Sequence, residues 1–250
     1  MSIIKNIIHK LLALINLRLE RITNYFPVET DNYEKKIIST CLKFSMTNEI
    51  RMSALVGSFK HIFHNNIPGD FVECGVWRGG NLILLQKLQE KYSLNRKIFA
   101  YDTFSGMPNA GPNDYDDQNI HANFYLSTEK KDALIKNTHC FTSLDEVNEN
   151  YKLNTKKNKN LNLIKGKVED TLQIKKNLPK KICILRLDTD FYSSTKIELE
   201  KLWPLLSKNG ILIIDDYGFW QGCKKAVDNY FKKKKFLVHI DRSCRLIFKI

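Results

Sequence analysis

Two short acidic clusters each follow an apolar segment of the sequence. Asp188 and Asp190 come just after one such segment, and Asp215 and Asp216 come directly after another. In an open α/β sheet the carboxyl ends of neighbouring strands line one crevice, so we expect these carboxylates to converge. Converging carboxylates repel each other unless a cation lies between them, and hard oxygen ligands suit Mg²⁺ or a similar divalent ion. The clusters therefore indicate a metal site, although one or more of the acids, Asp190 above all, could instead cap the helix that follows.

A third group of residues lies where an earlier apolar segment runs into a glycine-containing turn. Gly75 and Gly80 have the outer spacing of the dinucleotide-binding pattern GxGxxG, but Trp77 occupies the middle position and would obstruct a pyrophosphate. Glu73 stands two residues before the first glycine, which matches S-adenosylmethionine sites, where no pyrophosphate has to be accommodated. The same glycines could serve only a tight strand-to-helix turn.

Asp102 lies at the end of the next apolar segment along the chain. An acidic side chain in this place can accept hydrogen bonds from both ribose hydroxyls of an adenosine ligand, in dehydrogenases and methyltransferases alike. Asp102 therefore supports an adenosine-bearing cofactor without choosing between these two classes of enzyme.

The elements that must position these residues alternate between strands and helices from residue 71 onward, which is typical of βαβ units and a parallel sheet. Only three residues separate the last two apolar segments, too few for a crossover helix, so one of these strands should run antiparallel. The pattern predicts an α/β fold of the Rossmann-like class I methyltransferase type, with a seven-stranded, mostly parallel sheet, one antiparallel C-terminal strand and helices on both faces. The expected strands are residues 70–74, 97–101, 161–164, 181–187, 210–214, 236–240 and 244–250.

The composition is that of one folded domain rather than a disordered or membrane-spanning chain. Of the 250 residues 43% are apolar, and no apolar run approaches the roughly 20 residues of a transmembrane helix. The formal net charge of +13 lies largely in lysine-rich patches and is compatible with an anionic substrate. The six cysteines show no metal-ligand or disulfide spacing, which favours a reduced, cytoplasmic setting.

The N-terminal segment carries apolar residues at helical spacing and predicts an amphipathic helix. Such a helix could pack on its own domain, join two copies of the chain into a homo-oligomer, or lie on a membrane surface as a peripheral contact. The apolar positions are Ile4, Ile7, Ile8, Leu11, Leu12, Ile15, Leu19 and Ile22.

Taken in order, these motifs resemble the macrocin O-methyltransferase family, which methylates sugar hydroxyls in bacterial natural products and glycans. The longest matching segment is IPGDFVECGVWRGG, residues 67–80. The resemblance covers about residues 44–250, which divides the chain into an N-terminal helical extension, residues 1–43, and a methyltransferase domain. Asn81 departs from the pattern, because many members carry serine there. Further matching segments are residues 46–47, 101–107, 165–172, 215–218 and 222–227, together with the segment around Asp188.

The resemblance implies a reaction and a set of site residues. S-adenosylmethionine would donate the methyl group, Mg²⁺ or a similar ion would be held by Asp188, Asp215 and Asp216, and the acceptor would be a sugar hydroxyl of a glycan, nucleotide sugar or glycosylated natural product. Asp188 would be the catalytic base, with His121 in a loop as the alternative. The residues expected to bind the cofactor are Thr47, Glu73, Gly75, Asp102, Thr103, Glu169 and Asp170.

Other functions remain open on the sequence alone. A methyltransferase for a small non-sugar molecule or for nucleic acid would share the fold. However, residues 215–217 differ from the Asn/Asp-Pro-Pro-aromatic motif of amino-group methylation, and aromatic residues are not interleaved with the lysine runs, so we do not expect a nucleic-acid partner. A catalytically inactive binding protein of this fold would be expected to have lost an acid or the glycine turn, and both are present.

Overall fold

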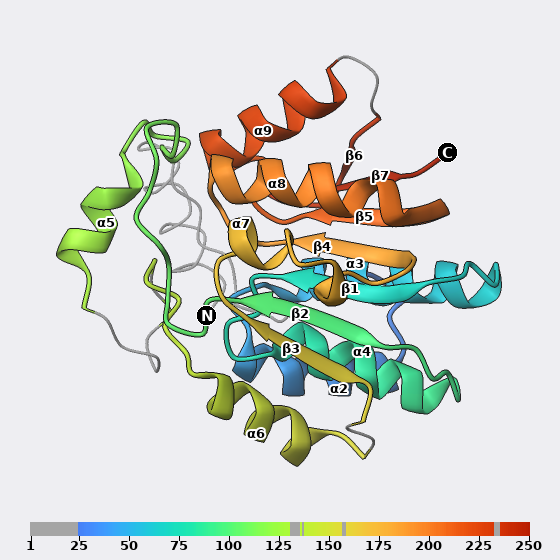
Figure 1. The fold of residues 1–250 in the computed structure, drawn as a ribbon. Coiled ribbons are helices and arrows are strands. Elements are labelled where there is room, and N and C mark those ends of the chain that lie inside the picture. The colour runs from blue at the N-terminus through green and yellow to red at the C-terminus, as the bar shows by residue number, and fades with distance from the viewer. Residues whose placement is uncertain (1–24, 131–135, 137, 157–158, 233–235) are drawn as a thin grey trace, which may run out of the picture.

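A computed structural model describes residues 25–130, 136, 138–156, 159–232 and 236–250. Its centre is a seven-stranded sheet in the order β3-β2-β1-β4-β5-β7-β6 (Figure 1). The first five strands are parallel, whereas β7 runs antiparallel to both of its neighbours, β5 and β6. The predicted mostly parallel sheet with one reversed C-terminal strand is thereby confirmed. The strands are β1 Asp70–Cys74, β2 Ile98–Asp102, β3 Leu161–Lys165, β4 Ile182–Leu187, β5 Leu206–Ile214, β6 Val238–His239 and β7 Arg245–Phe248.

Alternate side chains of the central strands enter two different hydrophobic layers, because successive residues of a strand point to opposite faces. In β5, Ile211 and Ile213 join the layer under α2, α3, α4 and α6, whereas Leu212 and Ile214 join the layer under α7, α8 and α9. Figure 1 accordingly shows α8 and α9 on one side of the sheet and α2 and α4 on the other. Both faces of the sheet are therefore covered, as a parallel sheet requires.

The helices begin at residues that can satisfy their first N–H groups. Asp31 and Glu34 form a capping box at the start of α2, and the side chains of Asn48 and Ser143 accept hydrogen bonds from the first turns of α3 and α6. The α-helices are α2 Asn32–Cys41, α3 Glu49–His64, α4 Gly80–Lys91, α5 Ala122–Thr128, α6 Leu144–Asn154, α7 Val168–Thr171, α8 Tyr192–Leu202 and α9 Gln221–Phe231. Short 3₁₀ helices are η1 Leu42–Phe44, η2 Lys175–Asn177 and η3 Trp203–Leu205.

The hydrogen-bond ladder of the sheet continues one residue beyond three neighbouring strands. The amide of Gly75 donates to the carbonyl of Tyr101 at 2.8 Å, and the amide of Asp188 donates to the carbonyl of Cys74 at 2.9 Å. Across the next pair, the amide of Asp215 donates to the carbonyl of Leu187 at 3.0 Å. The sheet register therefore fixes the backbone of three residues that the sequence places in the site.

The predicted amphipathic helix lies outside the described residues. Within the predicted N-terminal extension, α2 contributes Ile37, Ile38 and Cys41 to the same hydrophobic layer as α3 and α4. The division of the chain at residue 43 stays a prediction. Within the described part of the chain, the structure contains no helix whose length and apolarity would allow it to span a bilayer.

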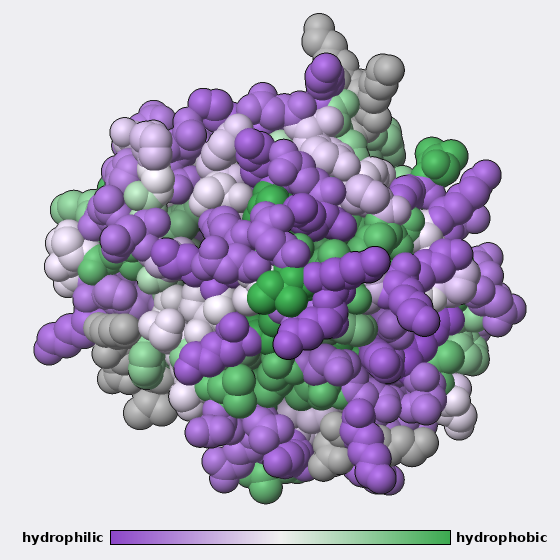
Figure 2. Space-filling model, viewed as in Figure 1, coloured by the Kyte–Doolittle hydropathy of each residue, from purple (hydrophilic) through white to green (hydrophobic). Residues whose placement is uncertain are grey.

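The lysines of the patch at residues 175–181 are exposed to solvent. Lys175, Lys176, Lys180 and Lys181, at the end of the sheet where β4 begins, are all exposed. The face drawn in Figure 2 is mostly hydrophilic, with smaller hydrophobic patches near its centre. The positive charge of this patch is thus carried by solvent-exposed side chains.

Candidate active site

A cavity of about 430 Å³ lies at the carboxyl ends of the central strands. The sheet order reverses direction between β1 and β4, and a crevice at such a switch point is the usual ligand site of an open α/β sheet. The cavity brings together nine of the residues singled out in the sequence: Thr47, Gly75, Asp102, Thr103, Glu169, Asp188, Asp190, Asp215 and Asp216.

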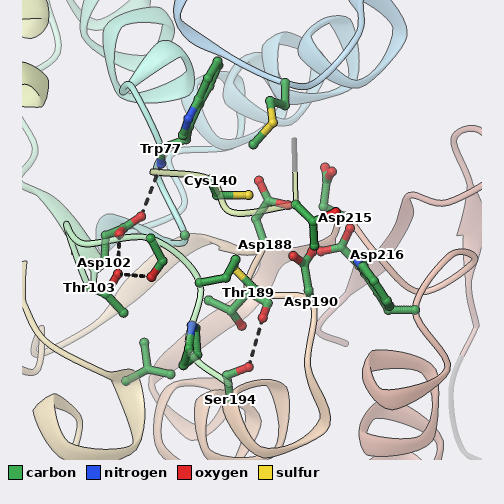
Figure 3. A pocket seen from close by; sticks show the side chains of 18 of the residues that line it. Trp77, Asp102, Thr103, Cys140, Asp188, Thr189, Asp190, Ser194, Asp215 and Asp216 are labelled. Carbon is green, nitrogen blue, oxygen red and sulfur yellow. Dashed lines mark hydrogen bonds between the residues drawn. The ribbon is translucent and has the colours of Figure 1, made fainter. Parts of the chain in front are cut away.

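Three of the acids form a group that could hold a metal ion. Asp188, Asp215 and Asp216 each offer one carboxylate oxygen, and these oxygens all lie within 4.8 Å of one another. Figure 3 shows them close together with Asp190, which also lines the cavity. The acids predicted from two separate strands therefore converge.

A buried arginine ties these acids to the glycine turn. Arg186, in β4, is only 4% exposed. Its Nη1 donates to Glu73 Oε1 and to Asp188 Oδ2, both at 2.7 Å, and its Nη2 donates to Asp215 Oδ1 at 2.7 Å. One guanidinium thus offsets part of the charge of three carboxylates, which would otherwise be costly to bury.

A second arginine reaches Asp215 from the cavity side. Arg51, in the first turn of α3, lines the cavity, and its Nη1 donates to Asp215 Oδ2 at 2.5 Å. Its Nε donates to Asp241 Oδ2 at 2.7 Å, in the turn between β6 and β7. Both oxygens of Asp215 are therefore bound by guanidinium groups.

The electrostatics of Asp188, Asp190 and Asp216 favour a cation. Burial raises the pKa of Asp188 to about 6 and that of Asp190 to about 7, and neighbouring carboxylates add to both shifts. Burial, and then the charges of Asp190 and Asp188, raise the pKa of Asp216 well above its ordinary value. Asp216 Oδ2 is buried and has no hydrogen-bond partner among the described residues. Hard oxygen donors with one oxygen unpartnered fit Mg²⁺ or a similar ion, whose charge would favour the ionised carboxylates.

The alternative role of Asp190 as a helix cap is wrong. The N-cap residue of α8 is Phe191, and the first amide of the helix, that of Tyr192, donates instead to Asp114 Oδ1 at 2.8 Å. Asp190 itself adopts a left-handed backbone with φ of 65°, a conformation that aspartate tolerates better than most residues. Asp190 therefore belongs to the cavity wall rather than to the helix.

The glycine turn lies directly against the loop that carries Asp188. Gly75 has φ of 78°, and a Cβ atom there would overlap the carbonyl oxygen of Asp188. Glu73 is buried behind this turn, where its Oε1 accepts hydrogen bonds from Asn81 and Arg186. Burial raises the pKa of Glu73 to about 7. Asn81, the departure from the family pattern, thus supports Glu73 from below the turn.

Of the remaining predicted cofactor residues, four line the cavity and one, Asp170, does not. Asp102 lines the cavity and accepts hydrogen bonds from the amides of Val76 and Trp77 through Oδ2, which ties the glycine turn to β2. Thr47, Thr103 and Glu169 also line the cavity, whereas Asp170 lies outside the set of described lining residues.

His121 likewise lies outside the described residues that line the cavity. It is the N-cap of α5, where its Nδ1 accepts from the amide of Asn123 at 3.2 Å and its Nε2 lies 3.0 Å from the carbonyl oxygen of Gly111. Both ring nitrogens therefore have local partners.

Sequence reasoning assigned no role to Arg186, Arg51 or Asp114. A signal for Arg186 was present, because an arginine inside an apolar strand is rarely buried without acidic partners. Arg51 and Asp114 carried no comparable signal, since each acts on a residue far away in the chain.

The sheet order, the reversed C-terminal strand and the position of the cavity define a class I methyltransferase fold. Within that class the chain belongs to the macrocin-O-methyltransferase (TylF) family, whose sequence model matches residues 9–247. The match starts nearer the N-terminus than the motifs around residue 44 indicated.

Similar proteins include two curated methyltransferases and one solved structure. The demethyldecarbamoylnovobiocin O-methyltransferase of Streptomyces niveus is 33% identical over 187 residues, 72% of this chain and 66% of that protein. The 8-demethyl-8-(2,3-dimethoxy-alpha-L-rhamnosyl)-tetracenomycin-C 4'-O-methyltransferase of Streptomyces olivaceus is 29% identical over 183 residues, 72% of this chain and 64% of that protein. The chain thus spans slightly less than two thirds of either relative. The structure of the O-methyltransferase NovP superimposes with a TM-score of 0.70 at 28% identity and covers 82% of both chains.

Proposed function

We propose that this protein is an S-adenosylmethionine- and divalent-metal-dependent O-methyltransferase that acts on a sugar hydroxyl. The observation that carries the proposal is the group of Asp188, Asp215 and Asp216 in the same cavity as the glycine turn and Asp102. A fold that only bound a ligand would have no need for three acids whose oxygens lie within 4.8 Å of one another.

The cofactor half of the cavity would hold S-adenosylmethionine, which supplies an electrophilic methyl group. Gly75 allows the chain to turn at the cavity wall. Asp102 would accept hydrogen bonds from the ribose hydroxyls, and Thr103 would donate a hydrogen bond to the ribose. Thr47 and Glu169 would bound the same half of the cavity. Glu73 would act from behind the turn by holding its shape, and Asp170 stays a predicted contact.

The acid half would hold a divalent ion through Asp188, Asp215 and Asp216, and such an ion lowers the pKa of a neighbouring hydroxyl. Arg186 keeps Asp188 and Asp215 in place by a hydrogen bond to each. Asp190 lines the cavity outside this group of three, so we propose that its carboxylate accepts the proton of the acceptor hydroxyl. Asp188, the base predicted from the sequence, is committed to Arg186 and to the metal group.

The proposed acceptor is inferred from the name of a relative. The name of the Streptomyces olivaceus relative specifies a rhamnosyl-bearing tetracenomycin, which supports a sugar as the methylated group. The net charge of +13 is compatible with an anionic acceptor such as a nucleotide sugar.

The test is transfer of a labelled methyl group from S-adenosylmethionine to a panel of nucleotide sugars, glycolipids and glycosylated natural products. EDTA should abolish transfer and excess Mg²⁺ should restore it. Asp188→Asn should lower turnover by about 100-fold or more while calorimetry still detects cofactor binding. Asp145→Asn, at an exposed position in the first turn of α6, is the matched control and should leave turnover unchanged. Full activity in EDTA would refute the metal dependence.

A further inference from the structure

The side chain of Arg51 places a positive charge in the cavity, beside the acids proposed to hold the metal. The side chain of Arg51 is 20% exposed and lines the cavity, whereas the side chain of Arg186 is 5% exposed and lies outside the described lining residues. The two guanidiniums bind opposite oxygens of Asp215: Arg186 binds Oδ1 at 2.7 Å and Arg51 binds Oδ2 at 2.5 Å. Asp215 Oδ2 is therefore the oxygen held by the arginine that lines the cavity.

A divalent ion that enters from the cavity would approach Asp215 from the side on which Arg51 lies. Asp188 and Asp216 also line the cavity, and all three acids share the group of oxygens within 4.8 Å. A guanidinium and a dication cannot both occupy the same side of one carboxylate oxygen, and their positive charges repel each other.

We propose that Arg51 is a displaceable cation that competes with the divalent metal for Asp215 Oδ2. This inference rests on the proposed metal site and adds a residue that regulates its affinity. In the metal-free protein Arg51 offsets part of the negative charge of the acid cluster, and metal binding requires it to leave Oδ2.

A second anchor would keep the displaced arginine close by. The Nε atom of Arg51 donates to Asp241 Oδ2 at 2.7 Å, and Asp241 is itself held by the side chain of Asn48 and the amides of Ser243 and Cys244. Arg51 can therefore release Asp215 without losing its attachment to the turn between β6 and β7.

The test compares Mn²⁺ binding, measured by electron paramagnetic resonance, in the full-length protein and in Arg51→Gln. The substitution removes the competing charge, so Mn²⁺ should bind at least about tenfold more tightly. Asp241 keeps three other hydrogen-bond donors, so the variant should fold, which circular dichroism checks. Lys91→Gln is the control: it removes one positive charge and one ion pair, with Asp31, from the end of α4. Its Mn²⁺ affinity should stay within about twofold of the wild type.

The outcomes separate this inference from the proposed function. If the wild type binds Mn²⁺ and Arg51→Gln binds it equally or more weakly, the inference is wrong and the metal site stands. If neither protein binds Mn²⁺, the metal dependence fails and the inference fails with it. A crystal structure of the wild type with Mn²⁺ provides a check without any variant: Arg51 Nη1 should have left Asp215 Oδ2, and an intact hydrogen bond beside a bound ion would overturn the competition.

Discussion

The four aspartates of the cavity differ in the partners that they already have. Asp215 is bound through both oxygens and Asp188 through Oδ2, in each case by arginine. Asp216 has a buried, unpartnered oxygen within the described residues, which suits a metal ligand. Asp190 lies beside this group in a left-handed backbone conformation that turns the loop at the cavity wall. These differences support the separate roles proposed for the acids.

Asp190→Asn should lower kcat by about 100-fold to 10,000-fold, because the variant cannot accept the proton of the acceptor hydroxyl. Mn²⁺ and S-adenosylmethionine should still bind, which calorimetry checks, since Asp190 lies outside the group of three proposed metal ligands. The comparison is Asp188→Asn, which should weaken Mn²⁺ binding as well as turnover. A larger loss of kcat in His121→Gln than in Asp190→Asn would instead identify His121 as the base.

At the scale of elements, α8 places a buried acid beneath the loop that carries Asp188. Glu198 is 0% exposed, and its Oε1 accepts a hydrogen bond from Thr189 Oγ1 at 2.9 Å. Burial raises the pKa of Glu198 from 4.5 to about 8. Between these values the folded state holds a proton that the unfolded state has released, so Glu198 makes stability fall as the pH rises.

Glu198→Gln should therefore be more stable than the wild type at high pH, because glutamine keeps the acceptor for Thr189 and carries no charge. The difference in the free energy of unfolding should grow by about 1–3 kcal/mol between about pH 5 and about pH 8.5, measured by urea denaturation. Glu200→Gln, on the same helix but 46% exposed, is the control and should show no such pH-dependent difference. If the stability of Glu198→Gln and that of the wild type change in parallel with pH, the raised pKa of Glu198 in the folded state is contradicted.

The strands and the reversal of one C-terminal strand were predictable because the apolar segments have strand length and because a three-residue connection excludes a crossover helix. The start of β5 was missed: the strand begins at Leu206, but Ser207, Lys208 and Asn209 interrupt the apolar pattern. The position of the acids at the strand ends was predictable because they follow closely after these apolar segments. Which acids Arg186 binds was not predictable, since Glu73 and Arg186 are 113 residues apart and meet only through the pairing of β1 with β4.

At the scale of the whole molecule, the N-terminal segment is proposed to join two copies of the chain. The first described residues already expose apolar side chains: Tyr25 is 67% exposed and Val28 is 100% exposed. Tyr25 and Val28 follow the predicted apolar stripe in the sequence, and we propose that a partner covers the surface that they form together. A second copy of the chain is the proposed partner, and a membrane surface is the alternative.

Deletion of residues 1–24 should therefore lower the molar mass in solution from that of an oligomer to that of a monomer, measured by light scattering. The cofactor affinity of the shortened chain should stay within about twofold, because the cavity is built from residues 46–220. An unchanged mass would argue against this role, and loss of binding to anionic lipid vesicles on deletion would favour the membrane instead.

The ladder that extends past β1, β4 and β5 also bears on how such a protein could change its acceptor over evolutionary time. Gly75, Asp188 and Asp215 are held by backbone hydrogen bonds to neighbouring strands, so their positions do not depend on the segment between β2 and β3. That segment supplies Met107, Pro108, Thr138 and Cys140 to the lining of the cavity. Substitutions or insertions there can reshape this part of the lining while the backbone of Gly75, Asp188 and Asp215 stays fixed by the sheet. The sheet thereby anchors the glycine turn and two of the proposed metal ligands independently of a segment that is free to diversify.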